Sequence, residues 1–267
     1  MEKREKPVMI DGKVIAKTIK EEIAKEVQDL LTEGKRPPHL VAVIVGEDGA
    51  SLSYVASKEK QSKEVGFTSS VYRFPESISE KELLETLDFL NKDPEVDGYI
   101  VQLPLPKHIN ERKVLEAIAP SKDVDGFHPS NGGRMMLGMP TYIPATPYGI
   151  KQLLDRSNIE TEGKHCVVLG RSNIVGTPMA ILMSRNSKKA NCTVTLCHSK
   201  TKNIKEICSS ADILIVAIGK PEFVTADMVK EGAVVIDVGI HRVPADNEKG
   251  YRIIGDVKFD EVAPKCS

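Results

Sequence analysis

A strand that turns through glycines into a helix is the feature that most restricts how this chain can fold. A short apolar run that includes residues 167–169 ends at Gly170, and Gly176 and Pro178 open a stretch that we expect to be an amphipathic helix. Glycine allows the close backbone approach that such a turn needs, and proline suits the first helical turn, where an N–H has no partner. A buried strand followed by a helix is the unit from which parallel sheets are built, so the pattern favours an α/β fold.

The same turn could present backbone N–H groups and the positive end of a helix dipole to a phosphate. The next strand-like run ends in His198-Ser199-Lys200. A site that prefers NAD usually has an acidic residue there, which binds the ribose 2′-hydroxyl. Hydroxyl and basic groups at that place, with Arg171 nearby, favour a 2′-phosphate and therefore NADP. The glycine spacing is Gly-x5-Gly rather than Gly-x-Gly-x-x-Gly, so a turn that serves packing alone is the alternative.

The size and charge of the chain limit the classes of protein to which it can belong. Its 267 residues are enough for two domains. The 37 basic and 38 acidic side chains nearly cancel, which argues against nucleic acid as a partner. The five cysteines form no Cys-x-x-Cys pair and the six histidines lack helical metal spacing, so we expect no metal site. The first six residues do not read as a secretory signal and no apolar run is long enough to span a bilayer, so we expect a cytoplasmic protein without a membrane partner.

Strands alternate with helices in both halves of the sequence. In the first half, the patterns predict helices near residues 12–34, 50–65, 80–91 and 110–119, and strands near 40–45, 69–73 and 98–103. In the second half, they predict strands near residues 165–169, 193–197, 212–217 and 233–238. This alternation implies parallel pairing and an α/β layer architecture.

The two halves join near residues 144–147. We expect a glycine-rich loop over residues 131–138 before the join, and then a helix that Thr146 caps and Pro147 opens. The fold class predicted is therefore two α/β domains, residues 1–145 and residues 146–267, the second Rossmann-like. A cleft between them would be the place where ligands bind.

Tyr54 and Lys58 stand four residues apart on an expected helix, so they share one helical face. A lysine partly shielded from water in a cleft can act as a general acid or base, whereas a solvated surface pair is the alternative. The Tyr-x-x-x-Lys spacing also occurs in short-chain dehydrogenases. There the pair follows the glycine motif, and here it precedes the glycine turn by more than a hundred residues.

Two further segments carry groups that could contact a ligand. The strand at Val101-Gln-Leu-Pro-Leu-Pro106 must stop at its prolines, and Gln102 could project from its carboxyl end; a buried glutamine satisfied by backbone is the alternative. Lys122-Asp-Val-Asp-Gly126 places two carboxylates two residues apart. Such an aspartate can accept two parallel bonds from an aminopyrimidine or pterin edge. A turn is the alternative, and the rest of a calcium-loop pattern is missing.

Taken together, these segments resemble the methylenetetrahydrofolate dehydrogenase/methenyltetrahydrofolate cyclohydrolase family of bifunctional folate enzymes. The matching motifs occur in family order across nearly the whole chain. They are Tyr54-x-x-x-Lys58, Asp97-Gly-Tyr-Ile-Val-Gln-Leu-Pro-Leu-Pro106, Lys122-Asp-Val-Asp-Gly126, Pro144-Ala-Thr-Pro-Tyr-Gly149, Gly170-Arg-Ser-Asn-Ile-Val-Gly176, Cys197-His-Ser-Lys200 and Val235-Ile-Asp-Val-Gly-Ile240.

The resemblance implies a role for each matching residue of the first half. Lys58 would be the general acid/base of the cyclohydrolase step, with Gln102 bonded to it. Tyr54 would pack against the folate rings, and Asp125 would hold the pterin edge. The catalytic residues implied are Lys58, Gln102 and Tyr54, and the substrate-binding residues are Tyr54, Lys58, Val101, Gln102, Leu103 and Asp125.

The resemblance also implies the cofactor site, the reactions and the assembly. Gly170 belongs to the cofactor-binding turn, Arg171, Ser172 and Ser199 would line the adenosine 2′-phosphate site of NADP, and Ile240 would contact the cofactor. The family oxidises 5,10-methylenetetrahydrofolate with NADP and hydrolyses the methenyl product to 10-formyltetrahydrofolate, in one-carbon metabolism and purine biosynthesis. It also implies a homodimer formed by the cofactor domains.

One departure from the family pattern concerns the end of the sequence. In the family, the pattern of Gly255-Asp-Val-Lys-Phe259 is followed by a Pro-Val-Pro-Gly-Gly-Val-Gly-Pro-Met segment that lines the folate cleft, and by a helix that packs on the first domain. This sequence stops at Ser267, where that segment begins in the family. If the protein itself ends there, we expect weaker folate binding and an exposed apolar patch on the first domain.

Two other functions remain open from the residues alone. A different two-domain NADP dehydrogenase, acting on a hydroxy or amino acid, would require neither Asp125 nor Gln102. A nucleotide-binding or assembly protein would bind NADP without binding or converting folate, for instance because the segment that completes the folate site is absent.

Overall fold

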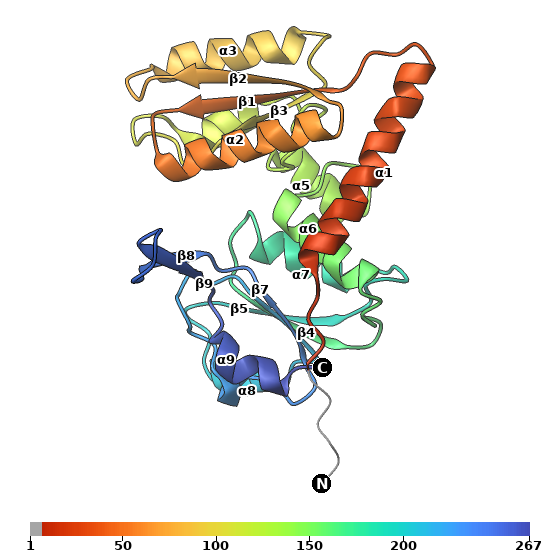
Figure 1. The fold of residues 1–267 in the computed structure, drawn as a ribbon, viewed down its shortest axis with the longest axis vertical. Helices are drawn as coiled ribbons and strands as arrows, with labels where there is room; N and C mark the ends of the chain where they lie inside the picture. Colours follow the sequence, from red (N-terminus) through yellow and green to blue (C-terminus); the bar gives the residue numbers. More distant parts are fainter. Residues whose placement is uncertain (1–6) are drawn as a thin grey trace. The chain divides into compact units, whose positions relative to one another are not determined.

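The computed structural model describes residues 7–267, and the prediction that residues 1–6 are not a secretory signal lies outside the described residues. The chain divides into two compact units. Residues 11–145 form the first unit, and residues 146–267 form the second, to which residues 7–10 also belong. Each unit has its own parallel sheet with helices around it (Figure 1), which confirms the predicted fold class of two α/β domains.

The first unit contains a three-stranded parallel sheet in the order β2-β1-β3. Its strands are β1 (His39–Val45), β2 (Thr68–Phe74) and β3 (Gly98–Val101). Its helices are α1 (Gly12–Thr32), α2 (Gly49–Glu64), α3 (Glu80–Lys92), α4 (Glu111–Ala117) and α5 (Pro129–Met136). The central strand β1 is buried on both faces, which explains why its sequence is a continuous apolar run rather than an alternating one.

Helices cover both faces of this sheet (Figure 1). On one face, Leu83 of α3 and Val114 of α4 pack in a core with Tyr99 of β3. On the other face, Val55 of α2 packs in a second cluster with Ile100 of β3. Because β1 and β3 are parallel, their carboxyl ends lie at the same edge of the sheet. Helix α2 begins four residues after the end of β1.

The predicted glycine-rich loop over residues 131–138 is wrong, because most of that range belongs to helix α5. His128 caps α5 through its ring Nδ1, which accepts from the N–H of Ser130 at 3.0 Å. Pro129 occupies the first helical position, where its missing N–H costs nothing. Asn131 is buried and hydrogen-bonded outside the helix. Capping and tertiary bonds thus outweigh the low helix propensity of the glycines.

The second unit contains a four-stranded parallel sheet in the order β5-β4-β6-β7, and a two-stranded antiparallel ribbon. Its strands are β4 (His165–Leu169), β5 (Thr193–Cys197), β6 (Ile213–Val216), β7 (Val234–Asp237), β8 (His241–Pro244) and β9 (Tyr251–Ile254). Its α-helices are α6 (Ala145–Arg156), α7 (Gly176–Ser184), α8 (Ile204–Ser209) and α9 (Phe259–Val262). The 3₁₀ turns are η1 (Ala226–Met228) and η2 (Ala263–Lys265).

The chain runs from β4 outward to β5 and then returns to β6 on the other side of β4. This reversal is the topological switch point of a Rossmann-like sheet, outside which nucleotides bind. The four predicted strands of this half are confirmed, with ends that differ by one residue at β6 and β7.

Two helix predictions in the second unit need correction. Helix α6 begins at Ala145, so Thr146 is not its cap and Pro147 is its third residue, a place where proline is also tolerated because first-turn N–H groups have no intrahelical partner. Helix α7 is not amphipathic, because most of its own side chains are apolar and they occur on all its faces. Pro178, Met179 and Met183 are all buried. Along residues 7–267, no helix has the length and apolar character needed to cross a bilayer.

Candidate functional site

A lysine and a glutamine from two different elements meet at the open edge of the first sheet. Lys58 lies on α2, and Gln102 directly follows β3. The Lys58 Nζ donates to Gln102 Oε1 at 3.4 Å, and both side chains are partly buried. The Gln102 Nε2 donates to the backbone oxygen of Leu103 at 2.8 Å, which fixes the orientation of the amide so that its oxygen faces the lysine.

The other residues predicted for this site lie around that pair. Tyr54, one turn before Lys58 on α2, is 51% exposed. Val101 is buried at the end of β3, and Leu103 is partly buried at the start of the proline-rich segment, which contains a cis peptide bond before Pro104. At the same edge, Val45, Gly46, Glu47, Asp48, Glu76, Pro104, Leu105 and Pro106 line a pocket of about 420 Å³.

The two carboxylates of the Lys122-Asp-Val-Asp-Gly126 segment have different environments. Asp123 is 1% exposed, and its Oδ2 accepts from the backbone N–H of His128 at 2.8 Å and from Asn131 Nδ2 at 2.9 Å. Asp125 has no comparable bonds along the described chain. Asp123 therefore holds its own loop in place, whereas Asp125 is left available to a ligand.

Asp125 is electrostatically coupled to the lysine. Burial raises the pKa of the Asp125 carboxyl above its ordinary value; the Lys58 charge opposes that shift, and the Asp123 charge adds to it. Gly126 at the end of the turn has φ +68°, and a Cβ there would lie 2.9 Å from backbone atoms of Ile143 and Pro144, so only glycine fits. The loop backbone thus fixes Asp125 at the edge that carries Lys58. We refer to Tyr54, Lys58, Gln102 and Asp125 as the lysine site.

In the second unit, the predicted glycine turn is built by close backbone contacts. Gly170 has φ +124°, and a Cβ on it would lie 2.1 Å from the backbone oxygen of Ala217. A Cβ on Gly176 would lie 1.9 Å from the backbone oxygen of Gly170. Neither position accepts any other residue without movement of the backbone. Ser172 in this turn binds the start of α7, since its Oγ accepts from the N–H of Gly176 at 3.4 Å and its backbone oxygen accepts from the N–H of Thr177 at 3.0 Å.

The residues predicted to recognise a 2′-phosphate lie at the carboxyl ends of two adjacent strands. Gly170 N–H donates to the backbone oxygen of Cys197 at 2.9 Å, so the residues after β4 and after β5 are neighbours. Arg171 and Ser199, which follow these two strands, are both exposed. Ser172 Oγ accepts from the backbone N–H of Val175 at 3.1 Å and shapes the turn.

Ile240, the remaining predicted cofactor contact, lies between the sheet and the ribbon and is 64% exposed. Around it the structure reveals residues that sequence reasoning missed. Asp256 is fully buried and accepts from the N–H groups of Ile218 and Gly219, and Asp237 binds the backbone of the same region. The available signal was an aspartate within two residues of a glycine at the ends of two segments, Asp237-Val-Gly239 and Gly255-Asp256.

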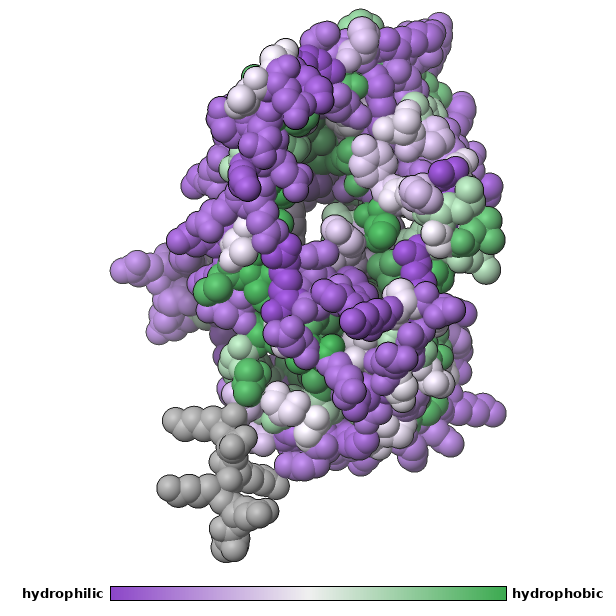
Figure 2. Space-filling model, turned by 90° about the vertical axis from the view of Figure 1, so that its right-hand side faces the viewer, coloured by the Kyte–Doolittle hydropathy of each residue, from purple (hydrophilic) through white to green (hydrophobic). Residues whose placement is uncertain are grey.

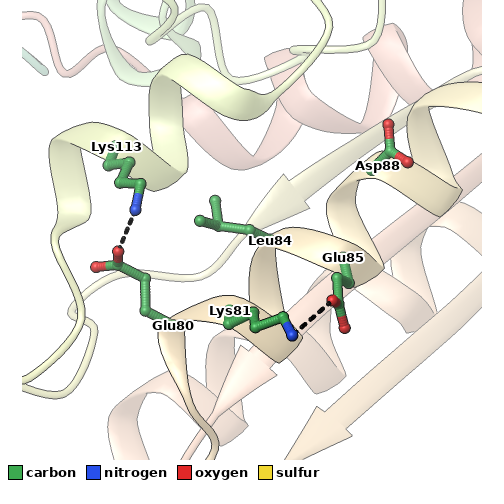
Figure 3. A pocket seen from close by; sticks show the side chains of 6 residues that line it. All are labelled: Glu80, Lys81, Leu84, Glu85, Asp88 and Lys113. Atoms are coloured by element: carbon green, nitrogen blue, oxygen red, sulfur yellow. Dashed lines mark hydrogen bonds and ion pairs between the residues drawn. The ribbon is translucent and has the colours of Figure 1, made fainter.

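A second surface depression, in the first unit, lies between α3 and α4 (Figure 3). Its charged side chains pair with each other or with neighbours on the same helix. The pairs are Glu80–Lys113, Lys81–Glu85 and Asp88–Lys92. The charges of this groove are therefore satisfied among themselves, and it provides no group comparable to Lys58 or Asp125.

Two family models match this chain. The model described as the catalytic domain of tetrahydrofolate dehydrogenase/cyclohydrolase matches residues 10–125. The model described as the NAD(P)-binding domain of tetrahydrofolate dehydrogenase/cyclohydrolase matches residues 144–267. The first match contains the lysine site, and the second contains the glycine turn and the residues around Ile240.

Curated relatives match over nearly the whole chain. The bifunctional protein FolD of Cytophaga hutchinsonii is 61% identical over 260 residues, which cover 97% of this chain and 90% of that protein. The bifunctional protein FolD of Porphyromonas gingivalis is 59% identical over 260 residues, with 97% and 88% covered.

Solved structures match in the same way. The bifunctional enzyme FolD (methylenetetrahydrofolate dehydrogenase/cyclohydrolase) from Campylobacter jejuni superposes with a TM-score of 0.91 at 44% identity, covering 97% of this chain and 89% of that one. The methylenetetrahydrofolate dehydrogenase-cyclohydrolase of Trypanosoma brucei, complexed with NADP cofactor and inhibitor, superposes with a TM-score of 0.90 at 35% identity, with 98% and 88% covered.

Proposed function

Because this chain belongs to the tetrahydrofolate dehydrogenase/cyclohydrolase family, we infer the function of the lysine site and of the glycine turn from the reactions of that family. The protein is a bifunctional enzyme of one-carbon metabolism. It oxidises 5,10-methylenetetrahydrofolate to 5,10-methenyltetrahydrofolate with NADP, and it hydrolyses the methenyl compound to 10-formyltetrahydrofolate. The residue roles that follow are our proposals.

The second unit fits NADP on three grounds. The glycine turn lets the pyrophosphate approach the backbone, and the start of α7 presents the positive end of a helix dipole. No carboxylate stands in His198-Ser199-Lys200, where an NAD site usually has one. When bound, NADP accepts the hydride that leaves the one-carbon bridge. Arg171, Ser172 and Ser199 would hold the 2′-phosphate, and Ile240 would contact the cofactor.

In the hydrolytic step, Lys58 moves the protons. Its amine takes a proton from the water that attacks the methenyl carbon, and its ammonium gives a proton to the ring nitrogen that leaves. Gln102 accepts from Lys58 and keeps the Nζ in one orientation. Asp125 accepts two N–H bonds from the aminopyrimidine edge of the pterin. Tyr54, with half its surface exposed, packs its ring against the folate rings.

The observation that carries this assignment is the contact between Lys58 and Gln102 at the edge that also holds Asp125. Here a residue that follows β3 binds a residue of α2, and the charge of the same lysine acts on a carboxylate of a third segment.

Replacement of Lys58 by methionine tests the assignment. General acid–base catalysis contributes about 10²- to 10⁴-fold, so we expect Lys58→Met to slow hydrolysis of methenyltetrahydrofolate by at least about a hundredfold. NADP binding, measured by calorimetry, should stay near normal because its site lies in the second unit. Lys60→Met, an exposed lysine of the same helix, is the matched control. Undiminished hydrolysis by Lys58→Met would refute the role.

We also propose a cytoplasmic homodimer whose product supplies purine biosynthesis. The surface in Figure 2 is largely hydrophilic, with hydrophobic side chains gathered in a few patches. The ribbon β8–β9 pairs only with itself in the described chain and carries Ile253, which is 53% exposed. Free strand edges readily pair with another chain, which supports association through the second units. Light scattering that detects only monomer would count against the dimer.

A further inference from the structure

Two aspartates bind together segments of the second unit that are distant in the sequence. Asp237, at the end of β7, accepts from the N–H groups of Gly239 and Asp256 at 2.9 Å each through Oδ1, and from Val257 N–H at 3.0 Å through Oδ2. Asp256 Oδ2 accepts from the N–H of Ile218, which follows β6, at 2.8 Å. The two carboxylates therefore connect the ends of β6 and β7 with the segment that follows β9.

The third member of this network is a histidine. His241 Nε2 lies 2.7 Å from Asp256 Oδ1, and Asp256 Oδ2 also accepts from Gly219 N–H at 2.9 Å. Asp256 is 0% exposed and the His241 side chain is 20% exposed. Because a carboxylate only accepts hydrogen bonds, the ring Nε2 must carry the proton and donate it. His241 is thus the one side chain in the described structure that donates to Asp256.

Two glycines allow the close contacts of this network. A Cβ on Gly239 would lie 2.4 Å from Asp256 N, and a Cβ on Gly255 would lie 1.7 Å from Asp237 Oδ2. Both glycines let the two carboxylates approach the backbone. The position of the chain between Gly239 and His241 is therefore determined at both ends by bonds to Asp237 and Asp256.

These hydrogen bonds lie at the edge of the sheet where the proposed cofactor site is located. Ile240 is the residue between the two fixed points. Ile218 and Gly219 follow β6, beside β4 at the switch point, and the backbone of Ala217 just before them touches Gly170 of the glycine turn. Removal of the His241 donor would leave one oxygen of a buried carboxylate unpaired, and the network would then have to move to regain water or another donor.

We propose that His241 is a positioning residue for the cofactor of the dehydrogenase step. Through its hydrogen bond to Asp256, it holds Ile240 and the backbone of Ile218 and Gly219 in the positions that receive NADP. This inference rests on the proposed cofactor site. It assigns to His241 no contact with substrate and no proton transfer.

The test compares two replacements of His241 in the full chain. His241→Leu removes the donor and keeps a side chain of branched shape, whereas His241→Gln places an amide nitrogen where the ring Nε2 stands. For each protein we would measure the Kd for NADP by calorimetry, and KM and kcat for NADP reduction with 5,10-methylenetetrahydrofolate. Methenyltetrahydrofolate hydrolysis without NADP and the thermal melting temperature report on damage beyond the cofactor site.

We expect His241→Leu to raise the Kd and KM for NADP by about tenfold, the order of one lost hydrogen bond to a buried charge, with a much smaller change in kcat. We expect His241→Gln to recover most of that loss. An unchanged Kd in His241→Leu, an equal loss in His241→Gln, or a parallel loss of hydrolysis would each overturn the proposal.

Two further controls keep the result interpretable. If His241→Leu melts below the assay temperature, His241→Asn replaces it, because its amide is too short to reach Asp256. If the unchanged protein binds NADP but does not reduce it with the folate substrate, the proposed function fails, while the Kd comparison still decides the role of His241.

Discussion

The two aspartates of the Lys122-Asp-Val-Asp-Gly126 segment are expected to differ in role, one stabilising the fold and the other binding folate. Asp123 is buried and bonded to its own loop, and Asp125 has a partly buried carboxyl close to the Lys58 charge. We predict that Asp123→Ala destabilises the protein and that Asp125→Asn does not, although Asp125→Asn weakens folate binding.

The expected size of the Asp123→Ala effect follows from its contacts. Its Oδ2 accepts from His128 N–H and from Asn131 Nδ2, and hydrogen bonds to a charged group contribute about 1.5–3 kcal/mol each. Asn131 Nδ2 keeps a second bond, to the backbone oxygen of Pro120 at 2.9 Å, so the low end of that range applies. The free energy of unfolding should fall by about 3 kcal/mol, which for a unit of this size lowers the melting temperature by roughly 10 °C.

The opposite sign is expected for Asp125, because burial raises the pKa of its carboxyl. When the pKa of a carboxyl is higher in the folded protein than in the unfolded chain, its ionisation lowers the free energy of unfolding. This loss is absent below the unfolded pKa near 4, grows as the pH rises toward the folded pKa, and is complete above it. Asp125→Asn should therefore melt at the same temperature as the unchanged protein or slightly higher at pH 7. That difference should disappear as the pH falls toward the ordinary carboxyl range.

Calorimetric melting of the unchanged protein and the two variants, together with KM for 5,10-methylenetetrahydrofolate, decides the question. The reasoning fails if Asp123→Ala melts within about 2 °C of the unchanged protein, or if Asp125→Asn is the less stable of the two. It fails as well if Asp125→Asn leaves the KM for folate unchanged.

Two predictions concern the cofactor site. Arg171→Ala should reduce the preference for NADP over NAD by about tenfold, the order of one charge-assisted bond to a phosphate; steady-state kinetics with both cofactors measures this, and an unaltered ratio contradicts the role of Arg171. Gly176→Ala should abolish measurable NADP binding, because its Cβ would lie 1.9 Å from the backbone oxygen of Gly170 and the turn must open. Calorimetric titration with NADP tests it, and retained affinity would show that the turn can adapt.

Local patterns predicted much of the fold. The buried runs at β1 and β4 and the periodic stretches at α1 and α3 appear where expected, because the alternation or continuity of apolar residues reflects which faces a segment buries. The failures lie where tertiary contacts override local preference. Helix α5 exists although its sequence contains two adjacent glycines, because a histidine cap and the buried side chain of Asn131 stabilise it.

The sequence predicted which residues belong to the candidate sites, and the structure showed which other residues they contact. Glycine spacing pointed to the turn at Gly170, and the Cβ positions there explain why glycine is needed. Spacing alone left Lys58 undecided between a surface pair and a site. The bond to Gln102, which is 44 positions away in the sequence, favours the site.

What the sequence by itself determined is the order of strands and helices, the two α/β halves and the family, because these depend on periodicity and on motifs read along the chain. Only the tertiary structure decided which of two neighbouring carboxylates is hydrogen-bonded within its own loop, and that His241 and Asp256 form one network. The physical reason is that the hydrogen-bond partners of a buried charge come from segments far away in the sequence, and no local pattern records which segments folding brings together.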